Sequence, residues 1–317
     1  MSFVVILFVF LKNAIYGLSV FFTGDLSENV DILDILALRF LISFTVLFLL
    51  KITGIIRVRV GVRDIFRKTE HSAQIRPLLL TGLFEPVLYM LLETAGIAMT
   101  TGITAAVILS LSPIFSCICE AIFLKESNTL TQKLLLGIGI VGVIYIAVHT
   151  NTDTGKDSIQ GIVFMFLAVI CGALFATFSR KVSKHFRPFE VSYIACLLGT
   201  VAFNALNLGK HLIAGTLPHY FDPFLQPRNL VAFAYLGILS TIVAASMNNY
   251  ALSKSRVSSL AAFSGVSTLV TIAADVLWNG EPLYPFHFIG ITLIFIRMIG
   301  VTWIDIKNNR LGVSASK

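Results

Sequence analysis

Mainly apolar stretches of about twenty residues follow one another along the whole chain, separated by short polar segments. A helix needs ~20 such residues to cross the hydrocarbon layer of a membrane, and helices satisfy their own backbone polar groups in lipid. The stretches are too long and too uniformly apolar for barrel strands. We predict transmembrane helices over residues 3–22, 34–52, 77–96, 102–124, 132–149, 159–180, 190–209, 229–252, 258–278 and 286–306.

Composition favours the same class. Of the 317 residues, 56% are hydrophobic and 13% are charged, against ~25% charged in an average soluble domain. The apolar N-terminus has no basic segment before it and is longer than a signal-peptide core of ~7–15 residues, so we interpret it as the first membrane helix. A chain of this length has no core large enough to hide so much apolar surface, and lipid is the expected solvent.

The net charge of +7 would suggest a nucleic-acid partner in a soluble protein. With the N-terminus in the cytoplasm, however, 18 of the 24 Lys and Arg residues fall in cytoplasmic segments or at the cytoplasmic ends of spans, three fall in outer segments and three lie deeper within spans. Cytoplasmic loops of membrane proteins carry this excess of basic residues. We therefore predict a multi-pass protein with both termini in the cytoplasm and no nucleic-acid partner.

One polar segment, residues 150–158, divides the chain almost in half. It separates a first five-helix unit, 1–149, from a second, 159–317. Setting Glu126 against Glu281, an offset of 155 residues, also aligns Glu120 with Asp275. Because five spans is an odd number, the two units must have opposite orientations, an arrangement that places a transporter's substrate site near the midplane. Chance similarity between apolar segments is the alternative explanation of the match.

Several short motifs resemble the EamA type of the drug/metabolite transporter superfamily. The matching residues are Ala105–Ile108, Leu111–Pro113, Phe123–Glu126, Tyr235–Ile238 and Asn249–Leu252. The resemblance implies an all-α membrane protein of about ten transmembrane helices in two inverted five-helix repeats. It also implies carriage of metabolites or drugs, often as export, across a bacterial cell (cytoplasmic) membrane. Thr268 stands where the family often has proline, so a kink in the ninth span is not assured.

The third predicted span carries the strongest candidate chemistry. Glu85, Tyr89 and Glu93 are spaced by four residues, so they share one helix face. Charged side chains at membrane depth are costly and are functional candidates by default, and poor hydration favours the neutral form of a carboxyl group. Pro86 removes a backbone hydrogen bond beside Glu85. The stripe suits a proton-binding or cation-binding site, and an internal ion pair that locks helices together is the alternative.

Other candidates are weaker. Lys12, next to Asn13 in the first span, is either a substrate contact or a counter-ion for Glu85. Pro113 follows Ser110 in the fourth span and either shapes a cavity through a helix break or makes a simple kink. Asn249 either contacts substrate or bonds a neighbouring helix. The remaining charges interpreted as lying at membrane depth are Arg39, Glu120, Asp275 and Arg297, of which Glu120 and Asp275 are interpreted as structural.

Enzyme signatures are missing from the sequence. It contains no GxxxxGK[ST] loop, no HExxH motif and no GxSxG motif. The four cysteines lie in apolar segments without histidines to complete a metal site, so neither a metal nor a cofactor is expected.

We predict a non-enzymatic secondary transporter of a small molecule, an exporter with proton coupling as one mode, whose partners are its substrate and the bilayer. An intramembrane enzyme for lipid-linked substrates, a channel or receptor, and an anion or sugar-phosphate exchanger are the alternatives. The oligomeric state is left open, with a homodimer as one option.

Overall fold

The computed structural model describes residues 3–56, 72–100, 102–109, 111–126, 129–149, 158–183, 185–278 and 285–310, and every regular element in these ranges is helical. In chain order the elements are α1 (Phe3–Ser27), α2 (Ile32–Ile52), α4 (Ser72–Gly82), η1 (Leu83–Leu88), α5 (Tyr89–Ala98), α6 (Gly102–Leu109), α7 (Ser112–Cys119), η2 (Glu120–Leu124), α8 (Leu130–His149), α9 (Ile159–Val182), α10 (Pro188–Ala214), η3 (Leu217–His219), η4 (Asp222–Leu225), α11 (Pro227–Ala234), η5 (Tyr235–Ala244), α12 (Ala245–Lys254), α13 (Val257–Ala261), α14 (Ser264–Trp278) and α15 (Pro285–Arg310). The predicted all-α class is confirmed for this part of the chain.

Within the described ranges, seven helices or helix runs are long and apolar enough to cross a membrane. They are Phe3–Ser27, Ile32–Ile52, Pro77–Ala98, Ile159–Val182, Pro188–Ala214, Pro227–Lys254 and Val257–Trp278. Three shorter apolar helices, Ser112–Leu124, Leu130–Gly142 and Phe288–Ile304, overlap the other three predicted spans. A membrane fold is therefore supported, whereas the total of ten crossings stays a prediction.

Large apolar side chains point outward along these helices. Ile159 is 82% exposed and Trp303 is 70% exposed, and many other large apolar residues share this outward position. A soluble protein rarely exposes so much contiguous apolar surface. In a membrane these side chains would contact lipid tails, which are as apolar as they are, and the cost of exposing them to water would not arise.

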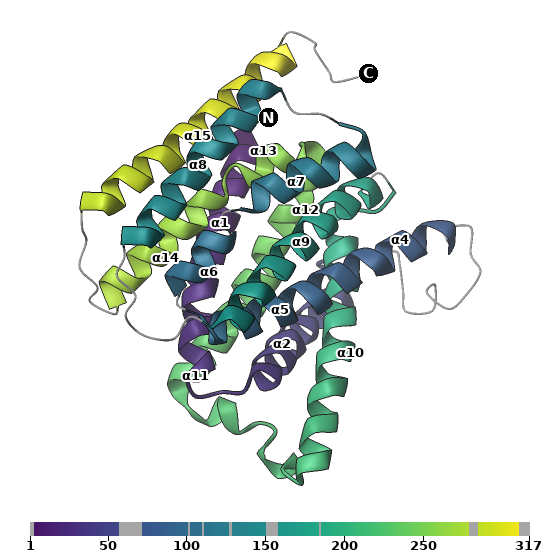
Figure 1. Cartoon of the computed structure of the whole chain (residues 1–317). Helices are drawn as coiled ribbons and strands as arrows, with labels where there is room; N and C mark the ends of the chain where they lie inside the picture. Colours follow the sequence, from purple (N-terminus) through teal and green to yellow (C-terminus); the bar gives the residue numbers. More distant parts are fainter. Residues whose placement is uncertain are drawn as a thin grey trace.

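Helix α1 lies at the centre of the packing (Figure 1), against α14 on one side and against η5 and α12 on the other. Helices α8 and α15 run along each other at one edge of the molecule, and α2 packs along α10 toward the opposite edge. The helices η1 and α5 pack against α9, and η1 also contacts α10. Several helices thus converge on the middle of the bundle.

The irregular stretches of helix recur in the two halves of the chain. The third long helix of each half contains a π-helical segment, η1 in the first and η5 in the second. At the offset of 155 residues, 83–88 corresponds to 238–243, which lies inside η5. The fourth helix is also interrupted in both halves, between α6 and α7 and between α13 and α14. The positions of the helix breaks are therefore consistent with the predicted repeat.

Helix α10 extends beyond the end of the predicted span 190–209, into the polar segment before the next predicted span. Its last turns are tied to the start of α2, because Lys210 Nζ lies 2.9 Å from Asp34 Oδ2 and His211 Nε2 lies 2.8 Å from Asp34 Oδ1. The helix ends at Ala214 and is capped by Gly215, which has a left-handed φ of 67°. Tertiary contacts of polar side chains thus prolong a helix past the apolar stretch that predicted it.

The close packing of α1 on α14 depends on Gly17. A Cβ atom there would lie 2.5 Å from the Ser267 carbonyl oxygen and 2.8 Å from Val270 Cβ. We expect Gly17→Ala to lower the free energy of unfolding by about 1–3 kcal/mol, as overpacking does. Thermal unfolding of the detergent-purified protein should show a melting point lower by several degrees. Gly209→Ala is the matched control, because no atom lies within 4 Å of its added Cβ; equal melting points for the two variants would contradict the packing.

Candidate functional site

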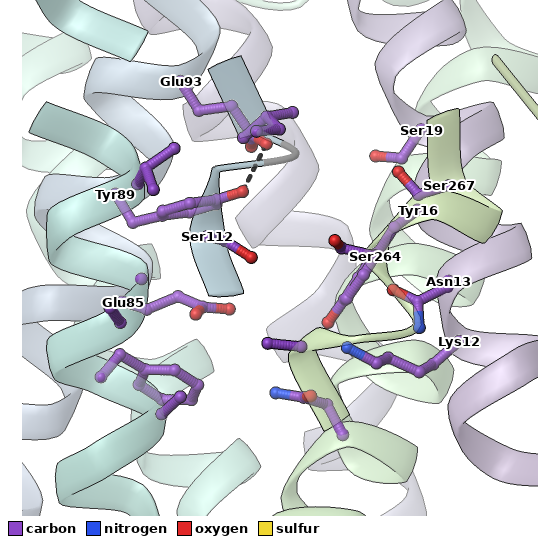
Figure 2. A pocket seen from close by; sticks show the side chains of 18 of the residues that line it. Lys12, Asn13, Tyr16, Ser19, Glu85, Tyr89, Glu93, Ser112, Ser264 and Ser267 are labelled. Carbon is purple, nitrogen blue, oxygen red and sulfur yellow. Dashed lines mark hydrogen bonds between the residues drawn. The ribbon is translucent and has the colours of Figure 1, made fainter. Parts of the chain in front are cut away.

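A cavity of about 170 Å³ lies in the middle of the bundle. Its walls come from both halves of the chain and include residues of α1, η1, α5, α7, α9, α13 and α14. One water molecule needs only ~10–15 Å³ of such space, so the cavity has room for a small organic molecule. Figure 2 shows polar side chains pointing into it from opposite walls.

Glu85 enters this cavity from a break in its helix. Its backbone is extended (φ −142°, ψ 119°) between helical neighbours, and Pro86, joined to it by a cis peptide bond, follows inside η1. The break differs from the continuous helix that the sequence predicted. It turns the Glu85 carboxyl group toward the cavity (Figure 2), where no hydrogen bond or ion pair to another described residue holds it.

Tyr89 and Glu93 line the same wall, one and two helical turns further along. The Tyr89 hydroxyl donates a hydrogen bond of 2.6 Å to Glu93 Oε1 (Figure 2). Gly172 on α9 lies directly behind the Tyr89 ring, since a Cβ atom at position 172 would lie 3.1 Å from the ring carbon Cε2. The three predicted side chains of this stripe therefore share one cavity, and Tyr89 orients Glu93 within it.

Lys12 lies on the opposite wall, which is formed by α1. Its ammonium group is 5.4 Å from the centre of the Tyr16 ring and points across the cavity toward Glu85 (Figure 2). Within the described residues no ion pair, that is, no N–O distance up to 4.0 Å, joins Lys12 to Glu85. Asn13 also lines the wall and donates a hydrogen bond of 2.7 Å to the Val9 carbonyl oxygen. Opposite charges thus face each other across open space.

Arg39 is a second cation at the cavity, although it is only 2% exposed. Its Nε donates to Thr241 Oγ1 at 2.8 Å and its Nη2 to Ser240 Oγ at 2.9 Å. Both hydroxyls belong to η5, the π-helical segment of the second half. With Lys12, Glu85 and Glu93, the cavity holds two acidic and two basic side chains, so its formal charge is zero.

Of the remaining predicted site residues, Ser110 is outside the described residues, and neither Pro113 nor Asn249 lines the central cavity. Pro113 is buried near the start of α7 and is not part of the cavity wall, although its neighbour Ser112 is. Asn249 bonds Ser179 Oγ at 2.9 Å and Ser192 Oγ at 2.9 Å and borders a smaller neighbouring cavity. These bonds match the interhelical alternative for Asn249.

Several residues that line the cavity were not candidates from the sequence, and three of them are polar residues on α1 and α14. Tyr16 follows Lys12 by four residues, so a helical-face argument could have paired them. Ser264 and Ser267 come from the start of α14 (Figure 2), and the offset of 155 residues aligns Ser267 with Ser112, which also lines the cavity. In the described part of the chain, no group of three or more His, Cys, Asp or Glu side chains is arranged to hold a metal.

An ion-pair network fixes the helix α13, whose Val257 lines the cavity. Arg180 Nη1 lies 3.2 Å from Glu120 Oε1 and 2.6 Å from Glu126 Oε2. Glu120 is fully buried and also accepts a bond of 2.6 Å from the Val257 amide. Arg256 completes the network, with its Nε 3.3 Å from Glu126 Oε2. The interpretation of Glu120 as structural agrees with these contacts.

Comparison with known proteins gives a consistent result. The family model described as "EamA-like transporter family" matches residues 3–148 and again residues 159–303. The uncharacterized transporter YcxC of Bacillus subtilis is 32% identical over 308 residues, which cover 97% of this chain and 96% of that protein. An uncharacterized transporter of Archaeoglobus fulgidus is 26% identical over 64% of this chain and 68% of its own length. One solved crystal structure shares the fold, with a TM-score of 0.69, 16% identity and coverage of 94% of this chain and 96% of that one.

The network around Arg180 gives a prediction for stability. Arg180→Gln leaves the buried Glu120 carboxylate without its cation, so we expect a loss of about 1–3 kcal/mol in the free energy of unfolding. Lys181→Gln, an exposed neighbour on the same helix, should change the melting point little. Equal effects of the two substitutions on thermal unfolding would contradict the assignment.

The same pair of variants has an expected pH dependence. Burial raises the pKa of Glu126, but hydrogen bonds from Arg180 and Arg256 outweigh it and hold that pKa below the usual 4.5. A lowered folded-state pKa contributes stability above pH 4.5 that is lost as the pH falls further. The melting-point difference between wild type and Arg180→Gln should therefore be complete at pH 7 and narrow below pH 4.5. A melting-point difference that stays constant down to pH 3 would contradict a stabilising ion pair between Arg180 and Glu126.

Proposed function

Since the chain belongs to the EamA-like transporter family, we propose that it carries a small molecule through the central cavity by alternating access, as a secondary transporter. The observation that supports this most is the carboxyl group of Glu85. It lies at a helix break, inside a cavity lined by both halves, and it faces Lys12 without an ion pair. Discontinuous helices commonly build substrate and ion sites in secondary transporters.

The proposed architecture has ten crossings in two inverted five-helix repeats, 1–149 and 159–317, joined by the polar linker 150–158. Two successive matches of the same family model and the recurring helix breaks support the repeat. The distribution of Lys and Arg supports termini in the cytoplasm, and a bacterial cell membrane is the proposed location. Export is the proposed direction, on the family resemblance alone.

In the proposed cycle, Glu85 takes up and releases a proton or binds a cationic group of the substrate. A carboxylate in a poorly hydrated cavity is unstable unless a proton or a cation compensates its charge. Lys12 supplies that charge when the two side chains approach, so ion pairing and ligand binding compete for Glu85. Glu93 and Tyr89 line the path further along the same helix. This competition is what would couple substrate movement to a proton gradient.

An anion exchanger is the second candidate, and the two cations of the cavity favour it. Arg39, however, already donates to two hydroxyl groups of η5, and two carboxyl groups share the space with it. A polyanionic substrate would meet like charges there, which costs several kcal/mol in binding. The cavity therefore suits a substrate that is cationic or has charge of both signs better than a sugar phosphate.

The coupling role of Glu85 is tested in proteoliposomes. A panel of metabolites is first screened by thermal shift, because a ligand of the folded state raises the melting point by mass action. With a hit as substrate, we expect Glu85→Gln to lower transport driven by a pH gradient at least tenfold, since the amide cannot exchange a proton.

Asp222→Asn is the control, because this carboxylate is exposed and lies outside the cavity. It should retain the wild-type rate. If Glu85→Gln kept the full dependence on the pH gradient, Glu85 would have no part in coupling.

A further inference from the structure

Arg297 is a buried cation that the transport mechanism above does not use. It lies near the middle of α15 and is 0% exposed, and its Nε and Nη1 have no hydrogen-bond partner among the described residues. Its one hydrogen bond to a described residue is long, because Nη2 lies 3.4 Å from Ser264 Oγ. A buried charge without a partner is strongly unfavourable, so an anion bound nearby would stabilise this side chain.

The surrounding helices are shaped to admit this side chain. A Cβ atom at Gly139 on α8 would lie 2.2 Å from Arg297 Cδ, and one at Gly265 on α14 would lie 2.7 Å from its Nη2. Glycines on two helices therefore make the space that the side chain fills. A methionine of similar length would pack there without the cost of a buried charge, so packing alone does not account for an arginine.

The guanidinium group points to the start of α14. This helix begins at Ser264, has 15 residues, and carries no acidic residue in its first turn. The first amide groups of a helix lack partners within it, and the helix dipole favours negative charge there. Val266 N already donates to the Phe263 carbonyl oxygen at 2.9 Å, so the amides that remain for a ligand are those of Ser264 and Gly265. Ser264 and Ser267 line the central cavity, and Figure 2 shows the Ser264 hydroxyl directed into it. The positive end of α14 is therefore accessible from the cavity.

Ser264 connects the two features. Because Arg297 Nη2 donates to its oxygen, the hydroxyl proton of Ser264 is left to donate toward the cavity. An anion could accept hydrogen bonds from the Ser264 hydroxyl and from the first free amides of α14. Only the Ser264 side chain would then separate the anion from the guanidinium group of Arg297. Helix N-termini with an adjacent cation are common anion-binding sites.

We propose that the start of α14 is a carboxylate-binding subsite of the cavity, formed by Ser264 and the first amides of α14 and completed by the charge of Arg297. A monoanion is favoured over phosphate, because Glu85 and Glu93 line the same cavity and would repel a dianion more strongly. The inference rests on the proposed transport function for its purpose, since it assigns one functional group of the substrate. The binding itself requires no transport.

The test measures binding of sodium propionate to the full-length protein in detergent, by thermal shift at constant ionic strength with chloride as the reference anion. Propionate should raise the wild-type melting point in a saturable way. Arg297→Met should melt at a higher temperature than wild type without ligand, because a buried charge is removed, and should need at least tenfold more propionate for the same shift. Ser264→Ala should weaken binding several-fold, and Arg297→Lys should retain more of the response than Arg297→Met.

Any of three results would overturn the subsite. The first is that propionate causes no saturable rise in the melting point of the wild type. The second is an equal rise in Arg297→Met and wild type, and the third is a larger rise with inorganic phosphate than with propionate. Should Arg297→Met not fold, Ser264→Ala against the control Asp222→Asn gives the same decision. A propionate response together with a failure of Glu85→Gln to affect transport would refute the coupling proposal and leave the subsite intact.

Discussion

Charged side chains at membrane depth must obtain from the protein the solvation that lipid does not provide, and this constraint organises the molecule. The cost of leaving them uncompensated is several kcal/mol or more. Glu120 meets the constraint fully, through Arg180 and a backbone amide. Arg39 meets it through two hydroxyl groups. These satisfied charges hold helices together and fix the walls around the cavity.

The charges that are less well compensated are those that face, or lie just behind, the cavity. Glu85 and Lys12 point toward each other without pairing, and Arg297 has two nitrogens without a partner among the described residues. Three incompletely compensated charges in one region lower the stability of the fold, so a role other than stability is needed to explain them. The unsatisfied groups are the ones whose compensation a ligand or a proton would provide.

The helix breaks obey a related constraint. A backbone polar group freed from a helix cannot face lipid, so irregular backbone is tolerated only against protein or a water-filled cavity. The segment η1 and the starts of α7 and α14 border the cavity, and η5 contributes Ser240 to its wall. The helix breaks therefore need a cavity or protein beside them to satisfy their backbone groups, and the cavity needs the breaks for its shape. This accounts for the interruption of the third and fourth helices of both halves at similar places.

Patterns within short stretches of sequence predicted the features that depend on neighbouring residues, namely the positions of helices and the residues that share a helix face. The apolar runs located the helices, and spacing by four residues placed Glu85, Tyr89 and Glu93 on one wall. The extended backbone at Glu85 was not predicted, because proline indicates a weakened helix without fixing which residue leaves it. The partners of Arg39 lie about two hundred residues away on η5, and the space for Arg297 is made by glycines on other helices. Such contacts depend on the assembled bundle, which no window of sequence contains.

The packing also explains how Lys12 and Glu85 could report the state of the transporter. Lys12 belongs to α1, which is bound closely to α14: Thr271 Oγ1 donates a bond of 3.0 Å to the Gly17 carbonyl oxygen. Glu85 belongs to η1, which packs against α9 and α10, where a Cβ atom at Gly199 would lie 2.8 Å from Pro86 Cγ. The two charges are thus carried by helices whose closest neighbours differ. A movement of α1 with α14 relative to η1 would change the separation of Lys12 and Glu85, and in the proposed cycle it would change the affinity of Glu85 for a proton or a cation.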